Sequence, residues 1–535
     1  MITANWKRSI YALLAIVLVL TAFLSAQAPL TAQAADAAEA AAPAQSQHAR
    51  YIFLFIGDGM GVAQRNSAEL YLANTENVET GLWYETKLLM NTFPAQGMTT
   101  TYDAGSIITD SASAGTAIAT GHKTLSGVIS MSPDKTEKYT TIAEIAKQQG
   151  WKVGVVTSVS LDHATPAVFY AHNASRKNMY AIAGDMVRSG FDYFAGGGLV
   201  QPQGSDGKSA DIYVIAQNSG YTIVDNAADF NALQPGDGKV LAMNGILDNE
   251  AAMYYEMDRA ENDLSLADYT RKGIELLDNP EGFFMMVEGG KIDWACHAND
   301  ATASIKDTLA FDAAIAEAYA FYQAHPDETA IIVTGDHETG GMSIGFAGTQ
   351  YASFFTKLTQ QPESYLEFNK ALEAFKAEKG ASARLEDAFP MIEEYFGMVA
   401  LSESDLKAAQ DAVAQGAAEG ASETDKAAAA EADALLSMTL TNAEIDVLRA
   451  AFAESMKDSS QRSSDSVAYN LYGGYEPLTI KLTTILDQKA GIGWTTYAHT
   501  GTPVQTSAVG VGNETFNGFY DNTEIFTKMM DIAGF

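Results

Sequence analysis

The chain has almost no cysteine and comparatively few basic residues. Of its 535 residues only Cys296 is a cysteine, so no disulfide can form within the chain. Its 33 Lys and Arg residues stand against 67 Asp and Glu residues, giving a formal net charge of -34. Surface solvation alone explains such acidity. The negative charge excludes nucleic acid as an expected partner, because the acidic protein and the phosphate backbone would repel each other. An anionic substrate would need a local cationic site, which metal ions can supply.

Long hydrophobic runs are also scarce, and the one present lies near the N-terminus. Lys7 and Arg8 precede an apolar run over residues 10–24, and Ala32-Gln33-Ala34 then forms the small-residue pattern that signal peptidase cuts. The run is short for a bilayer span, and no cysteine near the cut offers a lipid anchor. We therefore expect an export signal over residues 1–34, no stable membrane insertion, and a periplasmic or extracellular protein.

Hydrophobic residues make up 47% of the chain, which is enough for a large core. Continuous apolar runs of strand length occur at residues 51–56, 152–156, 283–287 and 330–333, and acidic residues follow most of them. Helical patterns lie between the runs, such as those over residues 140–149 and 301–324. This alternation predicts an α/β fold with a mostly parallel central sheet flanked by helices on both faces. In such sheets ligands bind outside the carboxyl ends of the strands, where these acids lie.

Shifts in composition predict how the chain is divided. An alanine-rich, mobile lead-in over residues 35–48 precedes a catalytic core over residues 49–347. Residues 348–477 are rich in Ala, Glu and Ser, with helical patterns such as a capping box from Thr441 to Glu444. We expect a helical insertion or a small subdomain there. Residues 478–535 return to the glycine-rich style of the catalytic core.

Carboxylates and imidazoles occur at spacings that suit metal ions. Asp293 and His297 lie four residues apart, so on a helical turn both point to the same side. Asp336 and His337 directly follow a predicted strand. Zinc in catalytic sites binds histidine and carboxylate ligands and keeps one position open. The candidate ligands are Asp293, His297 and His499 for one zinc ion, and Asp58, Asp336 and His337 for a second.

A third, oxygen-binding ion such as Mg²⁺ could share Asp58 and take Glu288 and the hydroxyl of Thr165. Each of these residues also has a structural explanation: a lone histidine is often a structural group, and Asp58 could merely shape a turn. Several strand ends that supply ligand-type residues together favour a metal site. Cys296 is expected to be a small buried residue on the opposite side of its turn.

Ser111 opens a run of small residues that suits a tightly packed helix. Taken alone, such a serine is interpreted as a helix cap. Beside bound metal its hydroxyl pKa falls, and the helix N-terminus favours an incoming negative charge, so Ser111 becomes a candidate nucleophile. Arg176 could hold two phosphoryl oxygens with its guanidinium, the alternative being an exposed arginine on a helix. Together these residues predict metal-assisted phosphoryl transfer.

These motifs resemble those of the alkaline phosphatases, from about residue 51 to 344 and again from about 478 to the end. The resemblance implies a phosphoserine on Ser111, Arg176 on the non-bridging oxygens, two Zn²⁺ and one Mg²⁺ in the ligand sets above, and phosphate monoesters of broad identity as substrates. It also implies a homodimer, which is common in the family. The segments that carry it are Thr109-Asp110-Ser111-Ala112 for the nucleophile, Val287 to Asp293 with His297 for magnesium and zinc, and Asp336-His337 and His499-Thr500-Gly501 for the remaining zinc ligands.

Two positions depart from the simplest bacterial pattern, which has aspartate and lysine near the phosphate and magnesium. Here they are His163 and Trp294, a pairing that resembles variants with rapid turnover. Trp294 brings no positive charge near bound phosphate, so we expect phosphate to inhibit weakly. His163 offers a nitrogen ligand, so the third site could admit Zn²⁺ or Co²⁺ in place of Mg²⁺.

Three other functions fit parts of the sequence. A phosphodiesterase of the same superfamily would generally use threonine as its nucleophile. A sulfatase needs a cysteine or serine inside a motif with proline and arginine, which surrounds neither Cys296 nor Ser111. A non-catalytic exported binder of metal or phosphate would have no need of a serine at a helix N-terminus among open metal positions.

Overall fold

The computed structural model describes residues 48–76 and 86–535, which belong to one compact unit. The predicted export signal and residues 35–47 of the predicted lead-in lie outside the described residues. Among the helices that the structure describes, none is long and apolar enough to cross a membrane.

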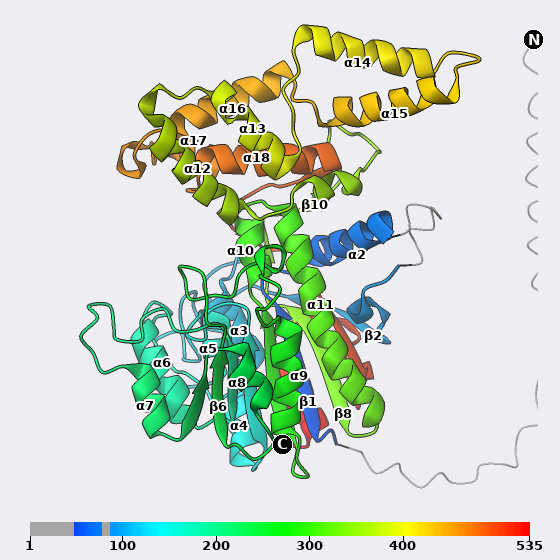
Figure 1. The fold of residues 1–535 in the computed structure, drawn as a ribbon. Coiled ribbons are helices and arrows are strands. Elements are labelled where there is room, and N and C mark those ends of the chain that lie inside the picture. Colours follow the sequence, from blue (N-terminus) through cyan, green and yellow to red (C-terminus); the bar gives the residue numbers. More distant parts are fainter. Residues whose placement is uncertain (1–47, 77–85) are drawn as a thin grey trace, which may run out of the picture. The chain divides into compact units, whose positions relative to one another are not determined.

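A ten-stranded sheet forms the centre of the fold (Figure 1). Neighbouring strands are parallel except for β13, which runs antiparallel to both of its neighbours. The predicted mostly parallel sheet is therefore confirmed, and the antiparallel strand is an addition to it. In spatial order the strands are β14 (Gly518–Asp521), β2 (Ala95–Thr100), β13 (Val504–Gly510), β8 (Thr329–Gly335), β1 (Tyr51–Gly57), β7 (Phe283–Gly289), β3 (Lys152–Thr157), β4 (Tyr193–Gly196), β6 (Lys239–Met243) and β5 (Tyr221–Val224).

Both faces of this sheet are buried, as the continuous apolar runs predict. Along β1, Phe53 and Phe55 point into one hydrophobic cluster, while Ile52 and Leu54 point into another. This alternation follows from the two-residue period of a strand. The first cluster contains residues of the helices over 62–76, 266–277 and 301–324, and the second contains residues of the helices over 111–120, 142–148, 179–189, 212–218 and 523–533. The predicted helices on both faces of the sheet are thus confirmed.

The helices follow the strands along the chain, and several begin at side-chain caps. Asp300, for example, accepts a hydrogen bond from Ala303 N and starts α11, whose bounds agree with the predicted helix. The helices up to the end of the first core segment are α2 (Val62–Glu76), α3 (Ser111–Thr120), α4 (Ile142–Gln148), α5 (Ala164–Ala167), α6 (Met179–Ser189), α7 (Ile212–Asn218), α8 (Ala227–Ala232), α9 (Leu266–Leu277), α10 (Lys291–His297) and α11 (Ala301–Ala324); α19 (Thr523–Ala533) ends the chain.

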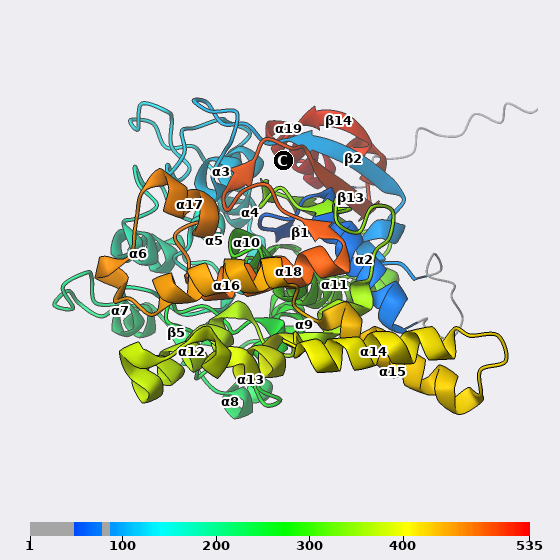
Figure 2. The same cartoon turned by 90° about the horizontal axis from the view of Figure 1, so that it is seen from above.

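The regular elements between β10 (Ser343–Ile344) and β11 (Ile492–Gly493) are helices. α14 and α15 lie side by side as a hairpin (Figures 1 and 2), and α18 packs against α16 and against a short 3₁₀ turn, Phe355–Gln360, that also contacts α2 and α11. The predicted boundaries of an insertion at residues 348–477 stay a prediction. The helices are α12 (Tyr365–Lys379), α13 (Leu385–Phe396), α14 (Glu403–Gly416), α15 (Glu423–Met438), α16 (Asn442–Ser455), α17 (Ser466–Tyr472) and α18 (Pro477–Ala490).

Candidate active site

The carboxyl ends of three central strands are aligned and bring acidic residues together. Gly57, the last residue of β1, pairs in register with the last residues of β7 and β8. Asp58 and Asp336 come directly after β1 and β8, and Glu288 lies one residue before the end of β7. One further strand pair adds a histidine: β12 (His499–Thr500) runs antiparallel to β9 (Glu338–Thr339). The site therefore lies at the edge where the sequence predicts it.

Two of the histidines turn the same ring nitrogen toward a shared carboxylate. His297 donates its Nδ1 proton to the carbonyl oxygen of Tyr497 at 2.7 Å, and His499 donates its own to the carbonyl of Thr109 at 2.8 Å. A carbonyl oxygen can only accept, so these bonds assign the tautomer of each neutral ring. The two Nε2 atoms then lie 3.1 Å apart beside Asp293 with unshared electron pairs facing each other. A proton on one of the rings, or a cation bound between the two nitrogens, would resolve this arrangement.

His337 has the same orientation. Its Nδ1 lies 3.2 Å from the hydroxyl of Thr339, which donates its proton to Asp293. The Nε2 atom of His337 therefore faces Asp58, Asp336 and Ser111 at 3.2, 3.4 and 3.3 Å. Ring orientation by a second hydrogen bond is typical of histidines that bind metal.

The carboxylates are buried and incompletely satisfied. Asp58, Glu288 and Asp336 are each 0% exposed, and one oxygen of each has no hydrogen-bond partner among the described residues. Burial, followed by the neighbouring acids, raises the pKa of Asp58 well above its usual range, and burial raises the pKa of Glu288 to about 7. Burial also acts to raise the pKa of Asp293, but His297 and His499 hold it well below its usual range. Such uncompensated oxygens fit a site built for cations.

Within residues 48–76 and 86–535, three groups of histidine and carboxylate side chains have ligand atoms within 4.8 Å of one another: Asp293 with His337 and His499, Asp58 with Asp336 and His337, and Asp58 with His163 and Glu288. The second group is the predicted second zinc set. In the first, His337 takes the place that the sequence prediction gave to His297, although His297 also contacts both Asp293 and His499. In the third, His163 joins Asp58 and Glu288, and the hydroxyl of Thr165, the other residue predicted for this ion, lies 3.4 Å from Asp58.

Ser111 is the first residue of α3 and is 2% exposed. It is not the cap of this helix, because Asp110 is the N-cap and forms a capping box with Ser113. The alternative interpretation of Ser111 as a helix cap is therefore wrong, and its hydroxyl is left to face His337. The serine thus lies between a helix N-terminus and the cluster of potential metal ligands.

Arg176 lies in a turn before α6 and is 24% exposed at its side chain. Its Nη1 donates to Asp110 at 3.0 Å, and its Nη2 donates to His163 Nε2 at 3.0 Å. The alternative of an exposed arginine on a helix is therefore wrong. Trp294 meets the ring of His163 nearly edge-on, with ring centroids 6.0 Å apart. All twelve residues that the sequence predicts for the site thus belong to this one cluster or contact its members.

Several residues that shape the cluster are absent from the sequence prediction. Thr339 bridges His337 and Asp293, Thr157 donates to Glu288, and Asp110 holds Arg176. Only Asp110 had a local signal, because an aspartate that precedes a run of small residues is a common N-cap. Cys296 is buried with its sulfur 3.2 Å from Ser304, and it is no part of the cluster, as predicted.

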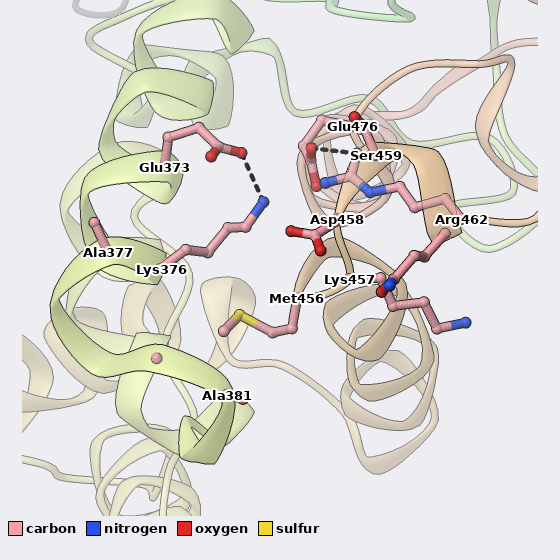
Figure 3. A pocket seen from close by; sticks show the side chains of 12 residues that line it. Glu373, Lys376, Ala377, Ala381, Met456, Lys457, Asp458, Ser459, Arg462 and Glu476 are labelled. Atoms are coloured by element: carbon pink, nitrogen blue, oxygen red, sulfur yellow. Dashed lines mark hydrogen bonds and ion pairs between the residues drawn. The ribbon is translucent and has the colours of Figure 1, made fainter.

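The structure also has an open cavity of about 740 Å³ within the helical segment, and Figure 3 shows its lining. None of its lining residues belongs to the cluster around Ser111. Its main charges pair with each other: Lys376 lies 2.7 Å from Glu373, and Arg462 lies 2.6 Å from Glu476. We assign no function to this cavity.

A serine at a helix N-terminus, among buried imidazoles and carboxylates at the carboxyl edge of an α/β sheet, defines a metal-dependent hydrolase. The sequence profile of the alkaline phosphatase family matches residues 49–535. The chain is 31% identical over 487 residues to alkaline phosphatase 3 of Bacillus subtilis (strain 168), covering 89% of this chain and 87% of that one. It is 30% identical over 484 residues to alkaline phosphatase 4 of the same organism, with the same coverage of both chains.

Among solved structures, the cold-active alkaline phosphatase of Shewanella sp. superposes with a TM-score of 0.66 at 28% identity, over 90% of this chain and 99% of that one. The chain belongs to the alkaline phosphatase family. It is a hydrolase of phosphate monoesters whose reaction depends on metal ions.

Proposed function

We propose that Ser111 is the nucleophile and carries the phosphoryl group as a phosphoserine intermediate. The observation that supports this most directly is the position of its hydroxyl, buried at the start of α3 and 3.3 Å from His337 Nε2. The backbone N–H groups at the start of a helix favour an approaching phosphoryl group. In the first step the Ser111 oxygen bonds to phosphorus and the alcohol leaves. In the second, water takes the phosphoryl group and the serine is restored.

The metal ions are two Zn²⁺ and one Mg²⁺ in this proposal. Bound metal stabilises negative charge on the attacking and leaving oxygens and lowers the pKa of the serine hydroxyl. The orphaned oxygens of Asp58, Glu288 and Asp336 support cation binding, and His163 within the third group supports Zn²⁺ or Co²⁺ as alternatives to Mg²⁺ there. The ligands would be Asp293, His297 and His499 for one Zn²⁺; Asp58, Asp336 and His337 for the other; and Asp58, Glu288 and Thr165 for Mg²⁺.

Arg176 would hold two non-bridging phosphoryl oxygens. It is already oriented by Asp110 and His163, so little side-chain freedom remains to be lost when substrate binds. Because the guanidinium grips only the phosphoryl end, the alcohol can vary, and small phosphate monoesters of broad identity are the proposed substrates. His163 and Trp294 complete this side of the substrate site.

Trp294 would make phosphate release easier than a lysine at this position, because it brings no positive charge. We expect Trp294→Lys to lower the inhibition constant for inorganic phosphate, measured against a chromogenic monoester. An unchanged inhibition constant would contradict this role of Trp294.

Export to the periplasm or the extracellular space, and assembly as a homodimer, complete the proposal. The charged and apolar pattern over residues 1–34 supports export. The family resemblance supports the dimer. Mass measurement of the mature protein would test both, because cleavage after Ala34 and a doubled mass in solution are the expected results.

The central test is acid trapping of the intermediate. The metal-loaded enzyme is incubated with a ³²P-labelled monoester, quenched in acid and digested, and the label is expected on the peptide that contains Ser111. Chelation should abolish both labelling and turnover, and added Zn²⁺ with Mg²⁺ should restore them. Full activity in thoroughly demetallated protein, or label on another residue, would refute the proposal.

A further inference from the structure

Lys291 is a buried cation directly beside the site. It is the first residue of α10, and its side chain is 0% exposed. Its Nζ lies 2.7 Å from a carboxylate oxygen of Asp248, which is 10% exposed. The other oxygen of Asp248 accepts from the backbone N–H groups of Glu250 and Ala252. A buried lysine is costly unless it is paired in this way, so the pair calls for an explanation.

The ammonium group of Lys291 also contacts two aromatic rings. Nζ lies 4.0 Å from the ring centroid of Tyr255 and 4.6 Å from that of Trp294. Trp294 lies three residues further along α10, on the same side of the helix. Cation–π attraction is strongest where the cation is desolvated, as it is here. The two rings and Asp248 together leave Lys291 little freedom, and Lys291 in turn limits the orientation of Trp294.

Trp294 is the first member of a chain of contacts that ends at Ser111. Its ring packs against His163, His163 accepts a hydrogen bond from Arg176, and Arg176 donates to Asp110. Asp110 is the N-cap of the helix that Ser111 opens. If Trp294 changed its rotamer, the ring of His163 would lose this packing contact. His163 is one of the two partners that orient Arg176, so Arg176 would be held less firmly.

We propose that Lys291 is a positioning residue: paired with Asp248, it fixes the ring of Trp294 and thereby holds His163 and Arg176 in place for the phosphoryl group. This inference rests on the proposed role of Arg176. It adds a residue pair outside the predicted site, and it assigns the pair an effect on phosphate binding rather than on the chemical step.

The test compares charge-neutral replacements of two lysine–carboxylate pairs, the buried pair of Lys291 with Asp248 and a pair in which Lys272 is buried and Glu275 is 45% exposed at its side chain. Lys291→Gln with Asp248→Asn removes both charges but keeps a side-chain hydrogen bond, so no unpaired charge is left behind. The matched control is Lys272→Gln with Glu275→Gln in α9, where Lys272 is 9% exposed and its Nζ lies 2.6 Å from Glu275. Lys291→Arg keeps the cation. If the first double variant does not fold, Lys291→Met with Asp248→Asn replaces it.

We expect the Lys291 double variant to raise KM and the inhibition constant of inorganic phosphate roughly fivefold or more, which corresponds to about 1 kcal/mol. Its kcat should change less. The fluorescence of Trp294, taken as the difference from a Trp294→Phe background, should shift. The control pair should leave KM, phosphate inhibition and this difference spectrum unchanged, and Lys291→Arg should restore much of the phosphate affinity.

Two outcomes would overturn the inference in distinguishable ways. If Arg176→Ala raises the phosphate inhibition constant but the Lys291 double variant leaves it unchanged, Lys291 has no positioning role and the proposed function stands. If Arg176→Ala also leaves phosphate affinity unchanged, the proposed role of Arg176 is wrong, and the inference that depends on it falls as well.

Discussion

The carboxyl edge of the sheet and the helical segment α12–α17 use charged residues in opposite ways. In the helical segment, charges are exposed and pair locally, as Lys426 does with Glu423 and Arg449 with Asp446. At the sheet edge, Asp58, Asp336 and His337 are all 0% exposed, and oxygens of both acids lack hydrogen-bond partners. The charged groups of the helical segment stay hydrated. The carboxylates at the sheet edge are buried and lack a full set of hydrogen bonds.

The energies of the two arrangements differ accordingly. An exposed ion pair contributes about 0–1 kcal/mol, whereas a buried charge without compensation costs several kcal/mol. Such a cluster lowers the stability of the metal-free fold, and the binding of metal ions explains why the chain has it. In this chain, therefore, buried polar atoms without hydrogen-bond partners indicate the position of the candidate active site better than the number of charged residues does.

The largest expected effect is the loss of the proposed nucleophile. Ser111→Ala should lower kcat by roughly 10³-fold or more, because the attacking oxygen is removed. The matched control is Ser404→Ala, an exposed serine in α14, which should leave kcat unchanged. Steady-state hydrolysis of a chromogenic monoester measures both. A comparable loss of kcat in both variants would contradict the proposed difference between the sheet edge and the helical segment.

The next effect concerns the two kinds of arginine. Arg176→Ala should lower kcat/KM by roughly 10- to 100-fold, since hydrogen bonds to charged groups contribute about 1.5–3 kcal/mol. Arg449→Ala in α16 removes a 53% exposed side chain that pairs with Asp446, and it should leave kcat/KM unchanged. Initial rates over a range of substrate concentrations separate the two. Equal kcat/KM in both variants would show that Arg176 does not bind the phosphoryl group.

A smaller effect is expected where the core meets the helical segment. Asp258 accepts a hydrogen bond from Ser364 N at 2.8 Å at the start of α12, and burial raises its pKa to about 6. Because this folded-state pKa lies above that of the unfolded chain, protonated Asp258 stabilises the fold at low pH, and the contribution is lost as pH rises through about 6. Asp258→Asn removes this pH dependence.

Between pH 5 and pH 8 the stability of wild type relative to Asp258→Asn should therefore fall by about 1 kcal/mol, measured by urea unfolding. Asp425→Asn in α15 serves as the control. Hydrogen bonds from Ser422 lower the pKa of Asp425, so it stays ionised over this range and should show no such trend. A flat difference for Asp258 would mean that its carboxyl titrates as it does in water.

The smallest effect is expected on the surface of the helical segment. Lys407 lies 2.8 Å from Asp411 in α14, and the two side chains are 74% and 68% exposed. Lys407→Ala should change the free energy of unfolding by no more than about 0.5 kcal/mol, because water screens the pair. Urea unfolding at low salt measures it, and a loss of several kcal/mol would erase the distinction between the solvated region and the buried one.

Much of the fold could be predicted because its signals are local. The apolar runs and the acidic residues after them predict the central strands, and the helix over residues 301–324 has the predicted bounds. Antiparallel β13 could not be predicted, because its neighbours β2 and β8 are set by pairing with residues far away in the chain. The capping of α3 by Asp110 instead of Ser111 was a choice between adjacent residues that only backbone geometry settles.

The candidate site follows the same division. Ligand-type residues at strand ends could be named from their chemistry and spacing. Their supporting contacts could not: the carbonyl of Tyr497 lies 200 residues from His297, and Asp248 lies 43 residues from Lys291. Nothing in the local pattern of a tyrosine or a lysine indicates such a partner, because the partner comes close only when distant segments of the chain pack together.

The sequence by itself determined which chemical groups are available and at which end of the sheet they gather, because strand period, helix period and the chemistry of side chains are properties of short segments. The tertiary structure alone decided which nitrogen of each histidine faces the cluster, which oxygens remain unsatisfied, and which cation stands behind Trp294. Those features depend on contacts between distant segments. Burial makes them energetically important because it removes water from charged groups, and the local sequence does not show which charged groups become buried.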